Sequence, residues 1–334
     1  MPPLMDKRMN LMLEDFSYMR EDIDNNLNNS ADRVAGPHGV IYGLLSTKNE
    51  VAKEMAVDLL SSDQLTQLLD ELDELRKMTH PNLSRIIMVG TNSRLLLIKM
   101  PAYAESLHNR MRDCQRSNKT IHLQEVLSVL RQVAAALEYL HSPCDGCSPT
   151  PHYNLKPSNI MFDSSGNISS SPMLEFTADI GERLLLALLK KSQYVAPEID
   201  IESDGEAYTF LSDMWSLGVI AYELLTGKLL HRESHDINEL SGKCDQRVIS
   251  LIDSLLSKDP TQRPTAKQFL TVLNDSYPLS LDDNRDSVLA SLERELRSLR
   301  EEVAYLKKES RASAEERAEL KKRLEKLEAL VKSK

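Results

Sequence analysis

The stretch from residue 211 to residue 225 constrains the fold most, because it is apolar nearly all round and includes Trp215, Val219 and Ile220. A helix without a polar face is buried in the middle of a large domain. The chain has 334 residues and 41% of them are hydrophobic, so it can bury a sizeable core. We therefore expect this stretch to be the central helix of the main domain.

The segments before this helix change in character along the chain. Glycine and β-branched residues predict a hairpin and a further strand within residues 31–60, and two more strands at 85–90 and 94–100. Ser62 and Asp63 predict the start of a helix that ends near Met78. Apolar residues at helical spacing then predict a long amphipathic helix over 123–141. Strands first and helices afterwards favour a two-lobed α+β body.

The two ends differ from this body, which we place at residues 31–280. In residues 1–30, apolar side chains at helical spacing predict a short helix followed by a polar link. From residue 285 to 334, apolar residues fill most a and d positions of one unbroken heptad register. Residues at positions g and e of successive heptads form four pairs of opposite charge, which favours a parallel coiled coil over a single solvated helix. We expect it to form a homodimer through residues 288–332.

Composition limits the other classes of partner. The net charge of −10 disfavours a general nucleic-acid binder, which needs clustered Lys and Arg. The sequence has no apolar run of membrane-spanning length and no secretory signal at its start, so we expect no membrane contact. Four cysteines form no disulfide framework, so the expected location is the cytoplasm, with the cytoskeleton as one site within it.

One short segment indicates a family. Residues 152–159 read His-Tyr-Asn-Leu-Lys-Pro-Ser-Asn, which resembles the catalytic loop of eukaryotic protein kinases, His-Arg-Asp-Leu-Lys-Pro-x-Asn. Three later segments resemble kinase motifs in the same order. They are 194–198 (the Ala-Pro-Glu region), 212–219 (the central helix) and 256–263. By this resemblance Asp213 of the central helix would hold the backbone of the catalytic loop, and Arg263 would pair with Glu198. The resemblance covers about residues 31–275 and implies a bilobal kinase-like fold with a β-rich small lobe and a helical large lobe. The coiled-coil tail is similar to the NEK group.

The resemblance also implies an ATP site. Gly36 and Gly39 occupy the second and third glycine positions of the phosphate-binding loop, although a plain hairpin turn is the more common explanation of two glycines. Val34 replaces the first glycine, and Pro37 removes one backbone donor. Lys53 matches the phosphate-binding lysine and Glu71 the helix glutamate that pairs with it.

For both Lys53 and Glu71, a solvated surface position is the alternative interpretation. At the back of the site the resemblance leaves two choices, Lys99 or Met100. A lysine there would narrow the pocket or pair with Glu71.

The catalytic loop departs from the family pattern at the general base. Asn154 stands where active kinases carry an aspartate that accepts the proton of the substrate hydroxyl. A carboxamide cannot accept a full proton at neutral pH, and a general base contributes about 10²–10⁴ in rate. Lys156 and Asn159 are kept and by resemblance would serve the γ-phosphate and a Mg²⁺.

The metal-binding Asp-Phe-Gly motif is also degraded. Without a gap its positions fall on residues 172–174, which carry no carboxylate. A small insertion makes Glu175 the metal ligand, and a longer one makes it Asp179. A degraded metal site is therefore the favoured interpretation, and the sequence leaves open whether ATP and Mg²⁺ are bound.

The activation segment differs from that of a phosphorylation-switched enzyme. Tyr153 replaces the arginine that normally pairs with an activation-loop phosphate. Residues 182–191 are apolar and helix-prone, so we expect them to pack as a fixed element.

These features together predict a pseudokinase, a catalytically impaired regulator or scaffold that dimerises and presents its kinase-like body to protein partners. The alternative is an active or weakly active Ser/Thr kinase that uses ATP and Mg²⁺.

Overall fold

The structure is a computed structural model, in which two compact units, Met1–Leu273 and Asn274–Lys334, can be distinguished. The residues that it describes are 3–27, 33–36, 39–44, 46–47, 49–142, 148–163, 168–170, 192–199, 208–231 and 236–278, with the single residues 296, 322 and 325. Within these ranges no helix is long and apolar enough to cross a membrane. The predicted coiled coil over 285–334 lies outside the described residues apart from those three positions.

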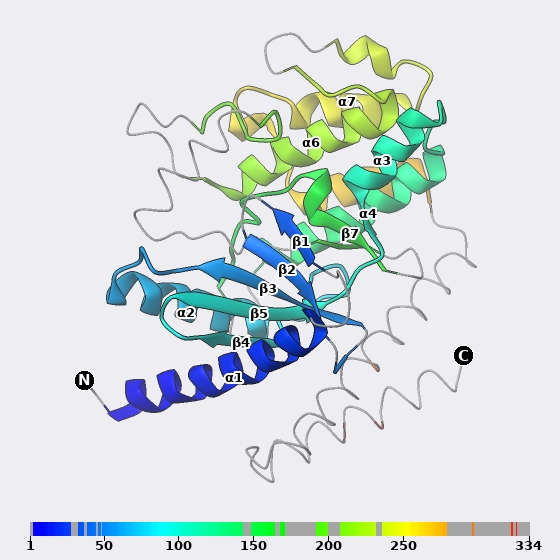
Figure 1. Ribbon diagram of the computed structural model, residues 1–334. Helices are drawn as coiled ribbons and strands as arrows, with labels where there is room; N and C mark the ends of the chain where they lie inside the picture. The colour runs from blue at the N-terminus through cyan, green and yellow to red at the C-terminus, as the bar shows by residue number, and fades with distance from the viewer. Residues whose placement is uncertain are drawn as a thin grey trace. The chain divides into compact units, whose positions relative to one another are not determined.

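The small lobe is built on an antiparallel sheet in the order β1-β2-β3-β5-β4 (Figure 1). Its strands are β1 (Arg33–Gly36), β2 (Gly39–Gly43), β3 (Glu50–Ala56), β4 (Met88–Thr91) and β5 (Leu95–Pro101). The predicted hairpin and the three further strands are thereby confirmed. β4 starts three residues later than the sequence pattern indicates.

Strand register separates the two faces of this sheet. Lys53 pairs with Ile98 and Met55 with Leu96, so these four side chains share one face. On that face lies α2 (Ser62–Lys77), whose buried leucines join Met55, Leu96 and Ile98 in one cluster. The helix begins at Ser62, and its cap is Ser61, one residue earlier than the predicted cap, because Ser61 and Gln64 form a reciprocal capping box.

The other face is covered by α1 (Pro3–Leu27), which Figure 1 shows alongside β4 and β5. The prediction of a short helix was wrong, because the apolar periodicity continues through Met19 and Ile23, which are 1% and 0% exposed. Helix and strand approach so closely that a Cβ on Gly90 would lie 2.3 Å from the backbone nitrogen of Phe16. Only glycine fits at this contact.

The large lobe is mostly helical. Its helices are α3 (Leu107–Arg116), α4 (Leu123–Leu140), α6 (Phe210–Thr226), α7 (Gln246–Leu255) and α8 (Ala266–Ser276), with 3₁₀ turns η1 (Pro157–Asn159), η2 (Ile237–Leu240) and η3 (Pro260–Gln262). A small sheet of β6 (Glu105–Ser106), β7 (Ile160–Phe162) and β8 (Ile168–Ser170) lies beside them.

The central helix predicted over 211–225 is α6. Its residues from Ser212 to Tyr222 are buried, and it packs against both α4 and α7. Gly218 permits the α7 contact, because a Cβ there would lie 2.8 Å from the Leu255 side chain. The two-lobed α+β body that the sequence predicts is thereby confirmed.

Candidate functional site

The loop at residues 152–159 is held by one buried carboxylate. Asp213, on α6 and 0% exposed, accepts the backbone N–H of His152 at 2.7 Å and that of Tyr153 at 3.1 Å. The same carboxylate contacts His141 Nε2 at 2.8 Å, and since it can only accept, the ring donates from Nε2. These bonds give Asp213 the loop-holding role that the sequence resemblance implies.

Tyr153 occupies a left-handed backbone conformation, with φ of 66°. Its ring packs against the ring of Tyr208, with centroids 5.1 Å apart, and the Tyr208 hydroxyl donates to Asp213 at 2.9 Å. Burial and the nearby Asp213 raise the pKa of Tyr208 well above its usual range, so it stays a donor. An aromatic pair therefore occupies the position where the family carries a phosphate-binding arginine.

His152 is fully buried, and both of its ring nitrogens lack a hydrogen-bond partner among the described residues. Burial lowers the pKa of His152 to about 4, because a charged ring cannot be solvated there. The neutral ring serves as core packing under the loop.

Asn154 and Asn159 are brought together by the loop. Asn154 is 4% exposed, and its backbone carbonyl accepts a 2.8 Å hydrogen bond from Asn159 Nδ2. This bond leaves Oδ1 as the acceptor atom of the Asn159 amide, a ligand type that Mg²⁺ prefers. Lys156 precedes η1 and is half-buried, and its carbonyl accepts the N–H of Asn159 at 2.9 Å.

Lys53 and Glu71 lie on two elements that pack together. Lys53 is half-buried on the α2-facing side of β3. Glu71 is half-buried on α2, where Gln67 Nε2 donates to it at 3.2 Å. The shared hydrophobic cluster of the two elements places the candidate lysine and glutamate on facing parts of the small lobe.

Gly36 and Gly39 close the hairpin between β1 and β2, where they are register partners. Gly39 has φ of 122°, and a Cβ there would lie 2.1 Å from the carbonyl oxygen of Glu54. The sheet geometry by itself thus requires glycine at 39, which favours the hairpin explanation for this residue. Pro37 and His38 are outside the described residues.

The register also decides which residue stands at the back of the site. Met100 pairs with Val51 and packs against the α2 cluster, so it lies on the same face as Lys53. Lys99 points to the opposite face, where its Nζ lies 2.6 Å from Glu50. The proposed pairing of Lys99 with Glu71 was wrong, because alternation along β5 directs the two side chains to different faces.

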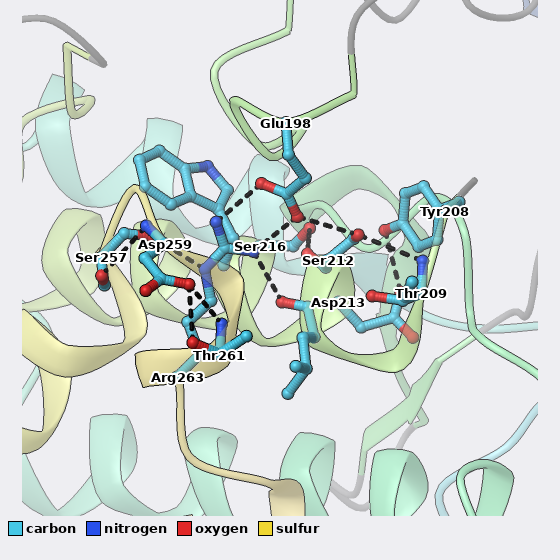
Figure 2. A network of polar contacts seen from close by, with 12 residues as sticks. Glu198, Tyr208, Thr209, Ser212, Asp213, Ser216, Ser257, Asp259, Thr261 and Arg263 are labelled. Atoms are coloured by element: carbon cyan, nitrogen blue, oxygen red, sulfur yellow. Dashed lines mark hydrogen bonds and ion pairs between the residues drawn. The ribbon is translucent and has the colours of Figure 1, made fainter. Parts of the chain in front are cut away.

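The end of the activation segment is fastened to the large lobe. Arg263 and Glu198 form a bidentate pair with both N–O distances at 2.7 Å, and Ser212 donates to the same glutamate (Figure 2). Arg263 also donates to the carbonyls of Leu211 and Ser257, each at 3.0 Å. This pair, which the sequence resemblance implies, is present.

Two further bonds fix residues 192–199. Ser216 Oγ donates to the carbonyl of Tyr194 at 2.8 Å, and the Tyr194 hydroxyl donates to Glu223. Burial and the neighbouring Glu223 raise the pKa of Tyr194, so the phenol keeps its proton.

The metal side of the site lies outside the described residues. Glu175, Asp179 and the apolar stretch 182–191 all belong to the undescribed range 171–191. Elsewhere in the described parts of the chain, no group of three or more His, Cys, Asp or Glu residues could hold a metal ion. Asn159 is thus the one predicted Mg²⁺ ligand whose surroundings can be described.

Sequence reasoning missed His141 and Tyr208 as members of the Asp213 network. Each is a single polar residue next to an apolar helix, and no spacing rule connects it to Asp213. Their role becomes visible only when α4 and α6 pack together.

Comparison with known families matches the protein kinase domain to residues 35–273 of this chain. The serine/threonine-protein kinase RUNKEL of Arabidopsis thaliana is 28% identical over 242 residues, which covers 65% of this chain and 16% of that protein. A calcium/calmodulin-dependent protein kinase of Metarhizium anisopliae is 26% identical over 244 residues, covering 72% of this chain and 60% of that protein. The serine/threonine-protein kinase PrkC of Bacillus subtilis is 24% identical over 253 residues, covering 69% and 37%. The chain thus spans less than two thirds of the length of each of these relatives.

Proposed function

The chain belongs to the protein kinase domain family, and from this premise we propose that it is a pseudokinase, a catalytically impaired regulator or scaffold. One observation carries the proposal: an asparagine occupies the general-base position of a loop whose family-type anchoring is intact. Asp213 holds the backbone on one side of Asn154 and Asn159 holds its carbonyl on the other. The proposed defect in transfer is therefore assigned to the Asn154 side chain, which cannot take the proton, and not to a misplaced loop.

Nucleotide binding is part of this proposal. The residues present fit the triphosphate of ATP in two respects. Lys53 supplies a cation on the α2-facing side of β3, and Asn159 offers one oxygen ligand to a magnesium ion. When bound, ATP would supply the phosphate groups, and Lys53 and the loop residues would orient them. Efficient transfer of a phosphate would not follow.

The finer assignment and the partners belong to the same proposal. We place the chain with NEK-like pseudokinases, because a kinase-like domain is followed along the chain by a tail with a heptad pattern. Residues 288–332 would dimerise the chain as a parallel coiled coil, leaving the folded domain to bind protein partners. Sedimentation of the full chain tests the dimer, because replacing Leu299 and Leu306 by lysine should leave a monomer.

A thermal-shift titration with ATP tests nucleotide binding. ATP at about 100 times its dissociation constant would stabilise the folded state by about 2.7 kcal/mol. Lys53→Met should remove this shift, whereas Lys77→Met, at the exposed end of α2, should retain it. No shift at millimolar ATP would contradict nucleotide binding and leave a protein-binding scaffold.

Phosphoryl transfer to mixed Ser/Thr peptides separates the proposal from the active-kinase alternative. We expect no transfer by the natural chain above background. If a metal ligand survives, Asn154→Asp should raise transfer by about 10²–10⁴. Ser158→Asp is the matched control, since Ser158 is exposed in the same loop and the change adds the same charge away from the general-base position. Robust transfer by the natural chain would overturn the proposal.

A further inference from the structure

The N-terminal helix α1 forms ion pairs with α2, the helix that carries Glu71. Arg8 donates to Asp70 at 2.5 Å and to Asp73 at 2.7 Å, and both carboxylates belong to α2. Asp70 and Asp73 are one turn apart and repel each other. A single guanidinium therefore bridges α1 to α2 and neutralises that repulsion.

Apolar packing joins the same two helices. Met12, which is 7% exposed, belongs to the hydrophobic cluster formed by the buried leucines of α2 and by strands β3 and β5. Since β4 is the edge strand, α1 can cover the outer face of the sheet and still reach this cluster. The first half of α1 is thus part of the core beneath α2.

The contacts of Arg8 with α2 lie on the side of that helix away from the candidate Lys53–Glu71 ion pair. At about 100° per residue, Glu71 is about 160° from Asp73 and about 100° from Asp70 around the helix axis, so the carboxylates that Arg8 contacts and Glu71 lie on opposite flanks of the buried leucine stripe. Arg8 can therefore hold α2 without occupying the flank that bears Glu71.

The second half of α1 is fixed to the sheet that carries Lys53. Arg20 lies 2.7 Å from Glu54 on β3, and Asn26 Nδ2 donates to the carbonyl of Gly43 at 2.9 Å. Asp22 accepts the N–H and the hydroxyl of Ser46, at 2.9 and 2.5 Å. Together with the close approach at Gly90, these contacts prevent α1 from sliding along the strands.

We propose that α1 is a built-in positioning element that locks α2 to the sheet, so that Glu71 stays beside Lys53 without any partner protein. Arg8 and Met12 are the positioning residues. The inference rests on the proposed nucleotide site for its consequence, whereas the locking of α2 is testable without any nucleotide.

Amide hydrogen exchange on the full-length chain tests the lock, with two closely matched variants. Arg8 and Arg20 each contact two carboxylates and are 30% and 33% exposed, but only the carboxylates bridged by Arg8 lie on α2. Arg8→Glu should speed exchange of the α2 amides about tenfold, because attraction becomes repulsion at two sites. Arg20→Glu should leave α2 exchange within about twofold of the natural chain, while exchange in β2 and β3 rises.

A charge swap decides whether the contact itself matters. Arg8→Glu combined with Asp70→Lys and Asp73→Lys should restore slow exchange in α2. The proposal is overturned if Arg8→Glu leaves α2 unchanged, if both arginine variants speed it equally, or if the swap fails to restore it.

Titration of the same variants with ATP keeps the two proposals apart. Weaker ATP binding by Arg8→Glu alone supports the effect on the Lys53–Glu71 pair. If the natural chain binds no ATP, the nucleotide proposal fails, and the exchange data still decide whether α1 locks α2.

Discussion

Removal of Arg263 is expected to destabilise the large lobe strongly. The Arg263 side chain is 0% exposed and Glu198 12% exposed, and the guanidinium donates four hydrogen bonds of 2.7–3.0 Å. Arg263→Met removes the guanidinium, whose Cζ lies 5.3 Å from the centroid of the Trp215 ring, and leaves a largely buried carboxylate and two carbonyls without these donors. Breaking a buried pair on one side costs about 3–5 kcal/mol, so we expect a loss of that size in the free energy of unfolding.

Urea unfolding followed by fluorescence of Trp215, the only tryptophan, measures this loss. Arg247→Ala is the control, because Arg247 is 61% exposed and forms a surface pair with Asp245, so its loss should cost less than about 1 kcal/mol. The double variant Arg263→Met with Glu198→Leu should recover part of the stability, since no unpaired carboxylate remains. A loss below about 1 kcal/mol for Arg263→Met, equal to that of the control, would refute the reasoning.

Two further predictions concern stability. Gly90→Ala should cost about 1–3 kcal/mol in urea unfolding, because a Cβ would lie within 2.8 Å of three backbone atoms of α1; unchanged stability would show that α1 is not seated on β4 as described. His152 should make the protein less stable in acid. Its folded pKa, about 4, lies below the unfolded value of about 6.5, so the unfolded chain binds the proton first. Stability fully present above pH 6.5 is then lost as the pH falls towards 4, by about 3 kcal/mol. His152→Leu should flatten this pH dependence, and an equally steep profile in the variant would contradict the burial argument.

The main body of the fold could be predicted because its signals are local. A helix such as α6, which is apolar on all sides, is stable only when it is buried in the centre of a domain. Segments that alternate in hydrophobicity or are bounded by glycine indicate the strands β1 to β5. The Arg263–Glu198 pair and the role of Asp213 followed from resemblance, since nothing in spacing alone joins residues 65 positions apart.

The seating of α1 could not be predicted from the sequence. Periodicity showed the start of a helix, but its docking depends on a missing Cβ at Gly90 and on Arg8 contacts across 62 and 65 residues. An exposed amphipathic helix carries the same pattern. The sequence came closer to deciding between Lys99 and Met100. Side chains alternate along β5, so the two residues lie on opposite faces of the sheet, and assigning the face of one neighbour assigns theirs.

Around residue 154, the contacts that hold the loop and the side chain that would act as the general base involve different atoms. Asp213 bonds to the backbone of His152 and Tyr153, and Asn159 bonds to the backbone of residue 154. None of these three contacts uses the Asn154 side chain, so the loop can keep its conformation whether that side chain is an amide or a carboxylate. Asn154 is 4% exposed, so we expect the carboxylate of Asn154→Asp to lower the free energy of unfolding, while the three backbone contacts keep the loop in place. When both proteins are folded at the assay temperature, a difference in phosphoryl transfer between them reports the proton acceptor itself, which is why that pair of proteins isolates the proposed defect.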